Sequence, residues 1–250
     1  MKIAVCIKRV PDMDGRFAIA GDGKSLDQNG LKFDIADFDG YAVEVALQLN
    51  EKNAPGESVV VSVGPDGVQE TLRKALGMGV DRAIQLKVDE VPFDGSAIAA
   101  ALAAELKDGG YDLILFGRMA TDSANQSVAP MVAQMLGLPA VTAVSKLEIA
   151  GGRGKAERQL EGATESVEFP LPAVLSIDEG VARPRLPSLK GIMTAKKKPL
   201  EVKPAQLGEA RLTVTKMELP ADRPPGRIVG EGADAVAELV RLLHDEAKVL

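Results

Sequence analysis

The sequence has 250 residues, of which 46% are hydrophobic and 26% charged, and its formal net charge at pH 7 is -6. A chain of this kind can bury a full core, so one α/β domain with extensions is the simplest organisation. The negative charge and an aromatic content of only 3% argue against nucleic-acid binding. The single cysteine, Cys6, excludes an intrachain disulfide framework and a cysteine-rich metal site.

The chain has no feature of a membrane or secreted protein. No apolar run approaches the ~18 residues that a membrane-spanning helix needs. The first residues lead directly into a strand-like run at residues 3–7 rather than into a signal sequence. We therefore expect a cytoplasmic chain without direct membrane insertion.

Short apolar runs alternate with stretches of helical periodicity through the first two thirds of the chain. Runs typical of buried parallel strands lie at residues 3–7, 58–63, 83–86, 113–116 and 173–177. Apolar residues recur at helical spacing within 42–49, 68–76, 98–102 and 128–136. This alternation predicts right-handed crossovers and a Rossmann-like parallel sheet with helices on both faces.

Two regions depart from this rhythm. Residues 11–38 are rich in Asp and Gly, and the turn at 21–24 predicts a small hairpin beside the sheet. Residues 142–170 alternate in polarity around a glycine-rich turn, which predicts antiparallel strands that extend one edge of the sheet.

Prolines become frequent after about residue 185 and predict a chain that leaves the compact domain. We expect an α/β domain over 1–182, a loop over 183–199 and a C-terminal arm over 200–250. The arm ends in a predicted helix, 233–248, which has no partner helix beside it in sequence. Its apolar stripe needs burial elsewhere, and packing on another chain would provide it; it consists of Val236, Leu239, Val240 and Leu243.

Candidate binding residues lie in turns that follow predicted strands, where parallel sheets bind ligands and helix N-termini attract anions. Such turns occur at residues 6–10, 64–67 and 117–127. The last is the strongest, because its arginine, hydroxyl and amide side chains suit a nucleotide phosphate and ribose. Asp122, Ser123 and Asn125 are equally explained as residues that cap the following helix, so both interpretations stay open.

No catalytic set of residues emerges from the sequence. The residues after the first strand, 8–11, contain neither G-x-G-x-x-G nor a P-loop pattern. Cys6 is interpreted as an inert core thiol, and His244 as a solvated side chain. Asp37 and Asp39 suit an acid–base pair but equally suit a turn and an N-cap before a helix at 40–50. The pattern indicates a binding protein rather than an enzyme.

The segment 183–199 places apolar side chains between prolines and follows them with three lysines. An exposed apolar group beside a basic patch indicates contact with a partner.

Four stretches, in order along the chain, resemble the β subunit of the electron transfer flavoproteins. They are the AVCIKRVPD run at 4–12, the VGP…QETLRKALGMGVDRA run at 63–83, the AERQLEG…LPAV run at 156–174 and the L…IM…AKKK run at 189–198. Each motif is modest alone, but their common order makes the resemblance specific.

The resemblance implies a fold of the adenine-nucleotide α-hydrolase type and a heterodimer in which this chain has no catalytic role. The α subunit would hold the redox FAD, and this chain would bind a structural AMP. Phe38 and Met13 would lie nearest the flavin. The implied AMP pocket consists of Cys6, Ala36, Asp37, Phe38, Asp39, Val63, Gly117, Arg118, Met119, Ala120, Thr121, Asp122, Ser123, Ala124, Asn125, Gln126, Ser127 and Val128.

The resemblance also implies docking partners. Leu189 would be the anchor in a pocket of an acyl-CoA dehydrogenase-type flavoenzyme, with Ile192 and Met193 beside it. Lys196, Lys197 and Lys198 would supply the steering charge. Electrons would pass to an ETF:quinone oxidoreductase-type acceptor in the membrane.

Two alternatives remain. Val128 and Pro130 are similar to the electron-bifurcating and nitrogen-fixation-associated branch, which holds a second FAD where other members hold AMP, whereas Asn125–Ser127 is similar to the AMP branch. We favour AMP. An adenine-nucleotide α-hydrolase-type enzyme would need a Ser/Gly-rich phosphate loop after the first strand, and residues 8–11 do not supply one.

Overall fold

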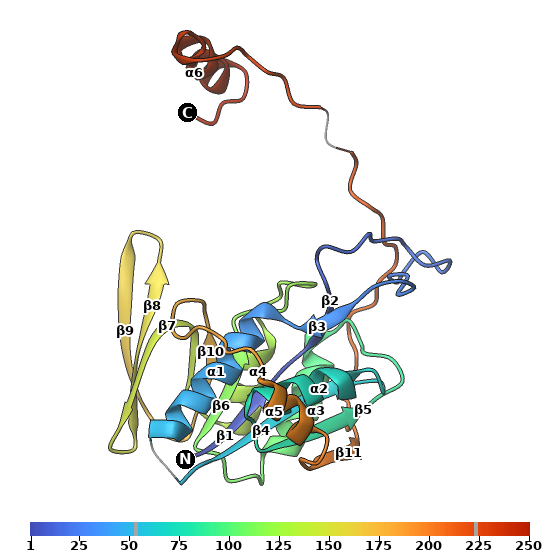
Figure 1. The fold of residues 1–250 in the computed structure, drawn as a ribbon, viewed down its shortest axis with the longest axis vertical. Coiled ribbons are helices and arrows are strands. Elements are labelled where there is room, and N and C mark those ends of the chain that lie inside the picture. Colours follow the sequence, from blue (N-terminus) through green and yellow to red (C-terminus); the bar gives the residue numbers. More distant parts are fainter. Residues whose placement is uncertain (53–54, 223–224) are drawn as a thin grey trace. The chain divides into compact units, whose positions relative to one another are not determined.

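The computed structural model describes residues 1–52, 55–222 and 225–250. These form two units, Met1–Lys216 and Met217–Leu250. The first unit is built on a mostly parallel sheet with helices packed on both faces (Figure 1). The predicted α/β class with a Rossmann-like sheet is confirmed.

The main sheet has nine strands in the order β11-β5-β4-β1-β6-β10-β7-β8-β9. Its parallel part contains each of the five buried strands that the sequence predicts. β8 and β9 pair antiparallel beyond β7, so the predicted edge extension is confirmed. The strands are β1 (Lys2–Cys6), β4 (Glu57–Gly64), β5 (Arg82–Lys87), β6 (Leu113–Gly117), β7 (Ala140–Ala150), β8 (Arg153–Leu160), β9 (Ala163–Pro170), β10 (Ala173–Ile177) and β11 (Leu200–Pro204).

The predicted hairpin in residues 11–38 is also present. β2 (Arg9–Pro11) and β3 (Phe33–Ile35) pair antiparallel as a separate two-stranded sheet. At the turn between them, the Asp22 carboxylate accepts hydrogen bonds from the backbone N–H groups of Lys24 and Ser25. A short polar side chain that bonds its own backbone in this way stabilises a tight turn.

Four helices cover the sheet. α1 (Asp37–Lys52) and α2 (Val68–Met78) share a core with one face, and α3 (Gly95–Leu106) and α4 (Val128–Leu136) share a core with the other. The central strands are buried on both faces, since Ile3 contributes to the first core and Ala4 to the second.

Helix α1 begins earlier than the sequence predicts. The backbone N–H groups of Asp39 and Gly40 donate to the carbonyl oxygen of Ala36, so the first turn already contains Asp39. The interpretation of Asp39 as an N-cap before a helix at 40–50 is therefore wrong. Its carboxylate instead accepts the backbone N–H groups of Lys8, two residues after β1, and of Gly117 at the end of β6, as described below.

The segment 183–199 is more ordered than the predicted loop. It contains a short helix, α5 (Leu189–Ala195), whose N-cap Ser188 accepts a hydrogen bond from the N–H of Gly191. The next residues form β11, which pairs parallel with β5 along the edge of the sheet. Residues 200–204 of the expected arm are therefore part of the main sheet, because the edge of β5 offers unpaired backbone groups that this strand satisfies.

The second unit contains a 3₁₀ turn, η1 (Ala233–Ala235), and helix α6 (Val236–Asp245), which is shorter than predicted. Three residues of the predicted stripe, Val236, Leu239 and Val240, are exposed. In the described part of the chain, every helix is too short or too polar to cross a bilayer.

A buried ion pair fixes the chain just before α5 to helix α1. Glu44 is only 3% exposed, and Arg185 donates hydrogen bonds to its carboxylate from the backbone N–H, Nε and Nη2. Arg185 also donates hydrogen bonds to the carboxylate of Glu51, about two helical turns farther along α1. Burial opposes the ionisation of Glu44, but hydrogen bonds from Arg185 and Gln48 outweigh it and hold the pKa of Glu44 below its ordinary value.

Replacing Arg185 tests this attachment. Arg185→Met leaves the Glu44 carboxylate buried without its cation, and we expect the free energy of unfolding to fall by roughly 3 kcal/mol. Urea unfolding of the full chain, followed by circular dichroism, measures the loss. Arg183→Met at the exposed neighbouring arginine is the matched control, and equal losses in both variants would contradict this role of Arg185.

Candidate functional site

The candidate site lies where the strand order reverses. β1 and β6 are parallel neighbours, and Cys6 is paired with Phe116 at their carboxyl ends. The chain leaves β1 toward α1 on one face and leaves β6 toward α4 on the other. The connections therefore diverge between these two strands, and this is the position at which open α/β sheets bind ligands.

The carboxylate of Asp39 joins the two strands at this point. Its Oδ2 accepts the backbone N–H of Lys8 at 2.7 Å, and its Oδ1 accepts the backbone N–H of Gly117 at 3.0 Å. Any Cβ at residue 117 would lie 2.4 Å from Asp39 Oδ1 and 2.5 Å from its backbone N. Glycine is therefore required here by the close approach of α1 to β6, and not by the torsion angles of a turn.

The same carboxylate has an unusual ionisation. Asp39 is 6% exposed, and burial raises its pKa to about 7, against the lowering effect of the N–H groups of Lys8 and Gly117. The negative charge of Asp122 adds to the increase, and the positive charge of Lys8 reduces it. The site thus contains a carboxyl group that titrates near neutral pH.

Lys8 connects the first turn to the long loop after β6. Its ammonium group lies 2.7 Å from the Asp122 carboxylate and 3.4 Å from the Ser123 hydroxyl. The implied AMP pocket includes Asp122 and Ser123 but not Lys8, although Lys8 lies in the candidate turn at residues 6–10. The sequence position of Lys8 already indicated the binding site, because the residue lies two positions beyond a buried strand, at the edge where ligands bind.

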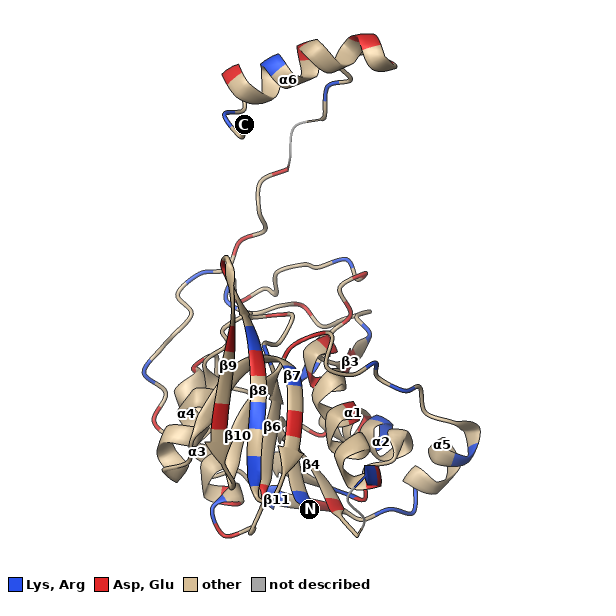
Figure 2. Ribbon diagram, turned by 90° about the vertical axis from the view of Figure 1, so that its left-hand side faces the viewer, with Lys and Arg blue, Asp and Glu red and all other residues tan. Residues whose placement is uncertain are grey.

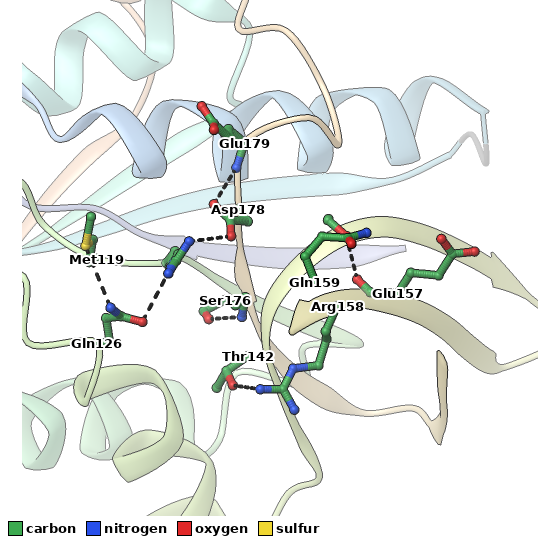
Figure 3. A network of polar contacts seen from close by, with 12 residues as sticks. Met119, Gln126, Thr142, Glu157, Arg158, Gln159, Ser176, Asp178 and Glu179 are labelled. Carbon is green, nitrogen blue, oxygen red and sulfur yellow. Dashed lines mark hydrogen bonds and ion pairs between the residues drawn. The ribbon is translucent and has the colours of Figure 1, made fainter. Parts of the chain in front are cut away.

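The loop over 118–127 is held at both ends and carries backbone strain in between. Arg118 pairs with Asp178, which directly follows β10, and the Gln126 amide lies between Arg118 and the sulfur of Met119 (Figure 3). Ala124 and Gln126 have φ angles of 50° and 54°, in the left-handed region that non-glycine residues rarely occupy. Strain of this kind clusters at binding sites, where surrounding contacts maintain it.

The start of α4 lacks the side-chain cap that one interpretation of this loop required. The N-cap residue is Ser127, and its side chain makes no capping hydrogen bond. Asp122 instead pairs with Lys8, far from the helix start in sequence. The interpretation of Asp122, Ser123 and Asn125 as simple capping residues is therefore not supported. The N–H groups of the first turn of α4 can bind an anion.

The other predicted site residues lie on the same edge of the sheet or close to it. Cys6 ends β1 in the core, and burial together with the negative charge of Asp39 raises the pKa of its thiol, as expected for an inert side chain. Val63 lies near the end of β4, and Phe38 packs against Tyr41 with ring centroids 6.2 Å apart. Met13 lies beyond β2 and is 57% exposed.

Two further charged residues at this edge are absent from the implied pocket, although one of them, Arg9, lies in the candidate turn at residues 6–10. Arg9 lies over the ring of Phe33 at 3.5 Å and near Gly67 at the start of α2. Asp178 positions Arg118 from the end of the neighbouring strand β10. Asp178 follows the predicted strand at 173–177, but only the strand order shows that β10 lies beside β6, so that Asp178 reaches Arg118.

Comparison with known proteins agrees with this architecture. The family model for the electron transfer flavoprotein domain matches residues 24–207. The chain is similar to the protein named electron transfer flavoprotein subunit beta of Bacillus subtilis (strain 168), with 38% identity over 260 residues and 100% of both chains covered. The chain belongs to the electron transfer flavoprotein family.

Proteins of the same name in other organisms show comparable similarity. The protein from Syntrophomonas wolfei is 37% identical over 250 residues, which cover 100% of this chain and 98% of that protein. The human protein is 35% identical over 249 residues, which cover 96% of each chain. The resemblance to the electron transfer flavoprotein β subunit is thus confirmed over the whole chain.

The raised pKa of Asp39 predicts a pH dependence of stability. The unfolded chain releases this proton near the ordinary pKa of 3.8, whereas the folded chain keeps it to about 7. The stabilising contribution of the protonated form is therefore fully present below pH 3.8 and is lost as the pH rises through about 7. A shift of this size corresponds to roughly 4 kcal/mol.

The variant Asp39→Asn removes this titration. Its amide group also presents N–H toward a backbone N–H, so we expect it to be less stable than the wild type by ~2 kcal/mol or more. Thermal unfolding should show a larger difference between wild type and variant at pH 5 than at pH 8. Asp37→Asn, at the exposed carboxylate of the same turn, is the control and should show no such change of difference with pH.

Proposed function

We propose that this chain is the non-catalytic half of a heterodimeric electron carrier, in which it binds a structural AMP and docks acyl-CoA dehydrogenase-type flavoenzymes. An α subunit holds the FAD that carries the electrons to an ETF:quinone oxidoreductase-type acceptor at the membrane. The observation that carries the proposal is α5, whose apolar side chains are exposed on a helix that is fixed to the domain. The names of the relatives support the electron-transfer role.

The edge between β1 and β6 fits a nucleotide phosphate. The uncapped start of α4 offers N–H donors, and Lys8 and Arg118 bring positive charge to the same connections. Asp39 holds the loops on both sides in place through Lys8 and Gly117. A bound AMP would supply no redox chemistry and would act as a fixed structural element, held by the loop over 117–128.

The docking surface consists of exposed apolar side chains beside basic residues. Leu189 is 84% exposed, Met193 73% and Ile192 50%, although each lies on an ordered helix. Lys and Arg residues mark α5 and the chain around it in Figure 2. A small apolar anchor with basic neighbours suits specific but brief contact with an acidic partner surface, as an electron carrier requires.

The remaining parts of the proposal concern the α subunit. The exposed stripe of α6, formed by Val236, Leu239 and Val240, would pack on that subunit. Met13 and Phe38 would face the flavin. The chain would then act in the cytoplasm as a carrier without catalytic residues of its own.

Nucleotide extraction from the purified complex tests the cofactor assignment. We expect one FAD and one AMP for each heterodimer after acid denaturation and chromatography. Lys8→Met should lower the AMP content and leave FAD unchanged, whereas Lys24→Met in the exposed turn should change neither. Two FAD without AMP would favour the bifurcating-type alternative, and the absence of any nucleotide beyond one FAD would contradict nucleotide binding by this chain.

Substitution of the anchor tests docking. Leu189→Ala should raise the apparent KM of the dehydrogenase for the carrier about tenfold, since a leucine side chain is removed from an apolar pocket. Heterodimer formation and bound nucleotides should stay unchanged. Met135→Ala, at a half-exposed apolar residue of α4 on the other face of the sheet, is the control. An unchanged KM in Leu189→Ala, or loss of the α subunit, would refute the anchor assignment.

A further inference from the structure

Helices α2 and α5 cap each other's C-terminal ends. Arg73 of α2 donates from Nη1 to the carbonyl oxygens of Ala195 at 2.6 Å and Lys198 at 2.7 Å, where α5 ends. Lys198, three residues after α5, donates from Nζ to the carbonyl oxygens of Leu76, Gly79 and Val80 at 3.1, 3.0 and 2.6 Å, where α2 ends. The last carbonyl groups of a helix lack partners within it, and cations there are favourable.

Helices α2 and α5 lie side by side (Figure 1), and a pair of glycines lies where they meet. A Cβ built on Gly191 of α5 would lie 2.3 Å from the carbonyl oxygen of Gly77 in α2. The atom that blocks it belongs to the backbone and cannot rotate away. The spacing between α2 and α5 thus depends on the absence of a side chain at residue 191.

The three lysines that follow α5, at residues 196–198, differ in whether they take part in these caps. Lys196 and Lys197 are exposed, whereas Lys198 is partly buried with its ammonium group on three carbonyl oxygens. Burial lowers the pKa of Lys198, and the negative charge of Asp81 opposes this effect. Lys198 therefore faces the protein and not a partner, so its predicted part in the steering charge is not supported by its position.

We propose that Arg73 and Lys198 are positioning residues of the docking surface, which hold α5 against α2 so that Leu189 and Met193 are presented in one fixed orientation. This inference rests on the docking role proposed above. The occupant of the surface is the acyl-CoA dehydrogenase-type partner, with an apolar pocket for Leu189 and an acidic rim for Lys190, Lys196 and Lys197. A short helix of seven residues is not stable alone, so its order depends on these contacts.

When α5 is already ordered before the partner binds, docking loses less conformational entropy. A loop with the same side chains would have to be ordered in each encounter. The caps should therefore affect the affinity of docking at every salt concentration, whereas exposed lysines should act mainly on the association rate at low salt.

Hydrogen exchange in the full-length protein tests the positioning directly. The amide of Ile192 donates to Ser188 and that of Lys197 to Thr194, so both report on α5. In Lys198→Met and Arg73→Gln, the hydrogens of these amides should exchange about tenfold faster than in the wild type, because a charge-assisted cap is lost. Lys196→Met removes the same charge from an exposed position and should leave both exchange rates unchanged. Unchanged rates in the cap variants would overturn the proposal.

The kinetic test uses reduction of the intact heterodimer by its acyl-CoA dehydrogenase. Lys198→Met, Arg73→Gln and Gly191→Ala should raise the apparent KM for the carrier several-fold at both low and high salt, with kcat and bound nucleotide unchanged. Gly191→Ala alters no charge, so agreement among the three assigns the effect to the position of α5. Lys196→Met should raise KM at low salt only, and Lys198→Arg should restore most of the loss.

The two proposals fail in different ways. If Leu189→Ala leaves KM unchanged, the docking function itself fails, whatever the exchange rates show. A different outcome overturns only the positioning role of Arg73 and Lys198. In that outcome Leu189→Ala raises KM, whereas the cap variants exchange faster but keep the wild-type KM at both salt concentrations.

Discussion

The carboxylate of Asp39 is the constraint on which the candidate site depends. One buried side chain accepts the backbone N–H groups that follow β1 and end β6, and it does so from the first turn of α1. It thereby fixes three elements at the point where the sheet opens to a ligand. The cost of burying this group appears in its pKa of about 7, and the close approach requires glycine at residue 117.

Helix α2 connects this edge of the sheet to the proposed docking surface. It starts after β4 at the turn with Gly67, beside Arg9, and it ends at Gly79, where Lys198 caps it. A helix of 11 residues separates the two ends by about 16 Å. The candidate site and α5 therefore lie toward opposite ends of α2.

Sequence patterns predicted the sheet, its helices and the antiparallel edge because burial on both faces of a strand leaves a continuous apolar run, as in residues 113–116. They did not predict α5 or β11. Both elements are short, and each is stabilised by contacts with distant residues: α5 by Arg73 and β11 by the edge of β5. Their local sequence, with its prolines, resembles a loop.

The site was predictable in its location and less so in its contacts. Residues 117–127 follow a strand, and this alone placed them at the binding edge. The partners that shape the site, Lys8 with Asp122 and Arg118 with Asp178, are 114 and 60 residues apart. Periodicity reports which residues are buried and how each element repeats, so the sequence by itself determined the class of fold, and the four stretches that resemble the electron transfer flavoprotein β subunit indicated the family. Only the tertiary structure decided which groups meet where the strand order reverses, and that Lys198 caps α2 instead of facing a partner. The physical reason is that such contacts depend on strand order and helix spacing, which no local sequence pattern records.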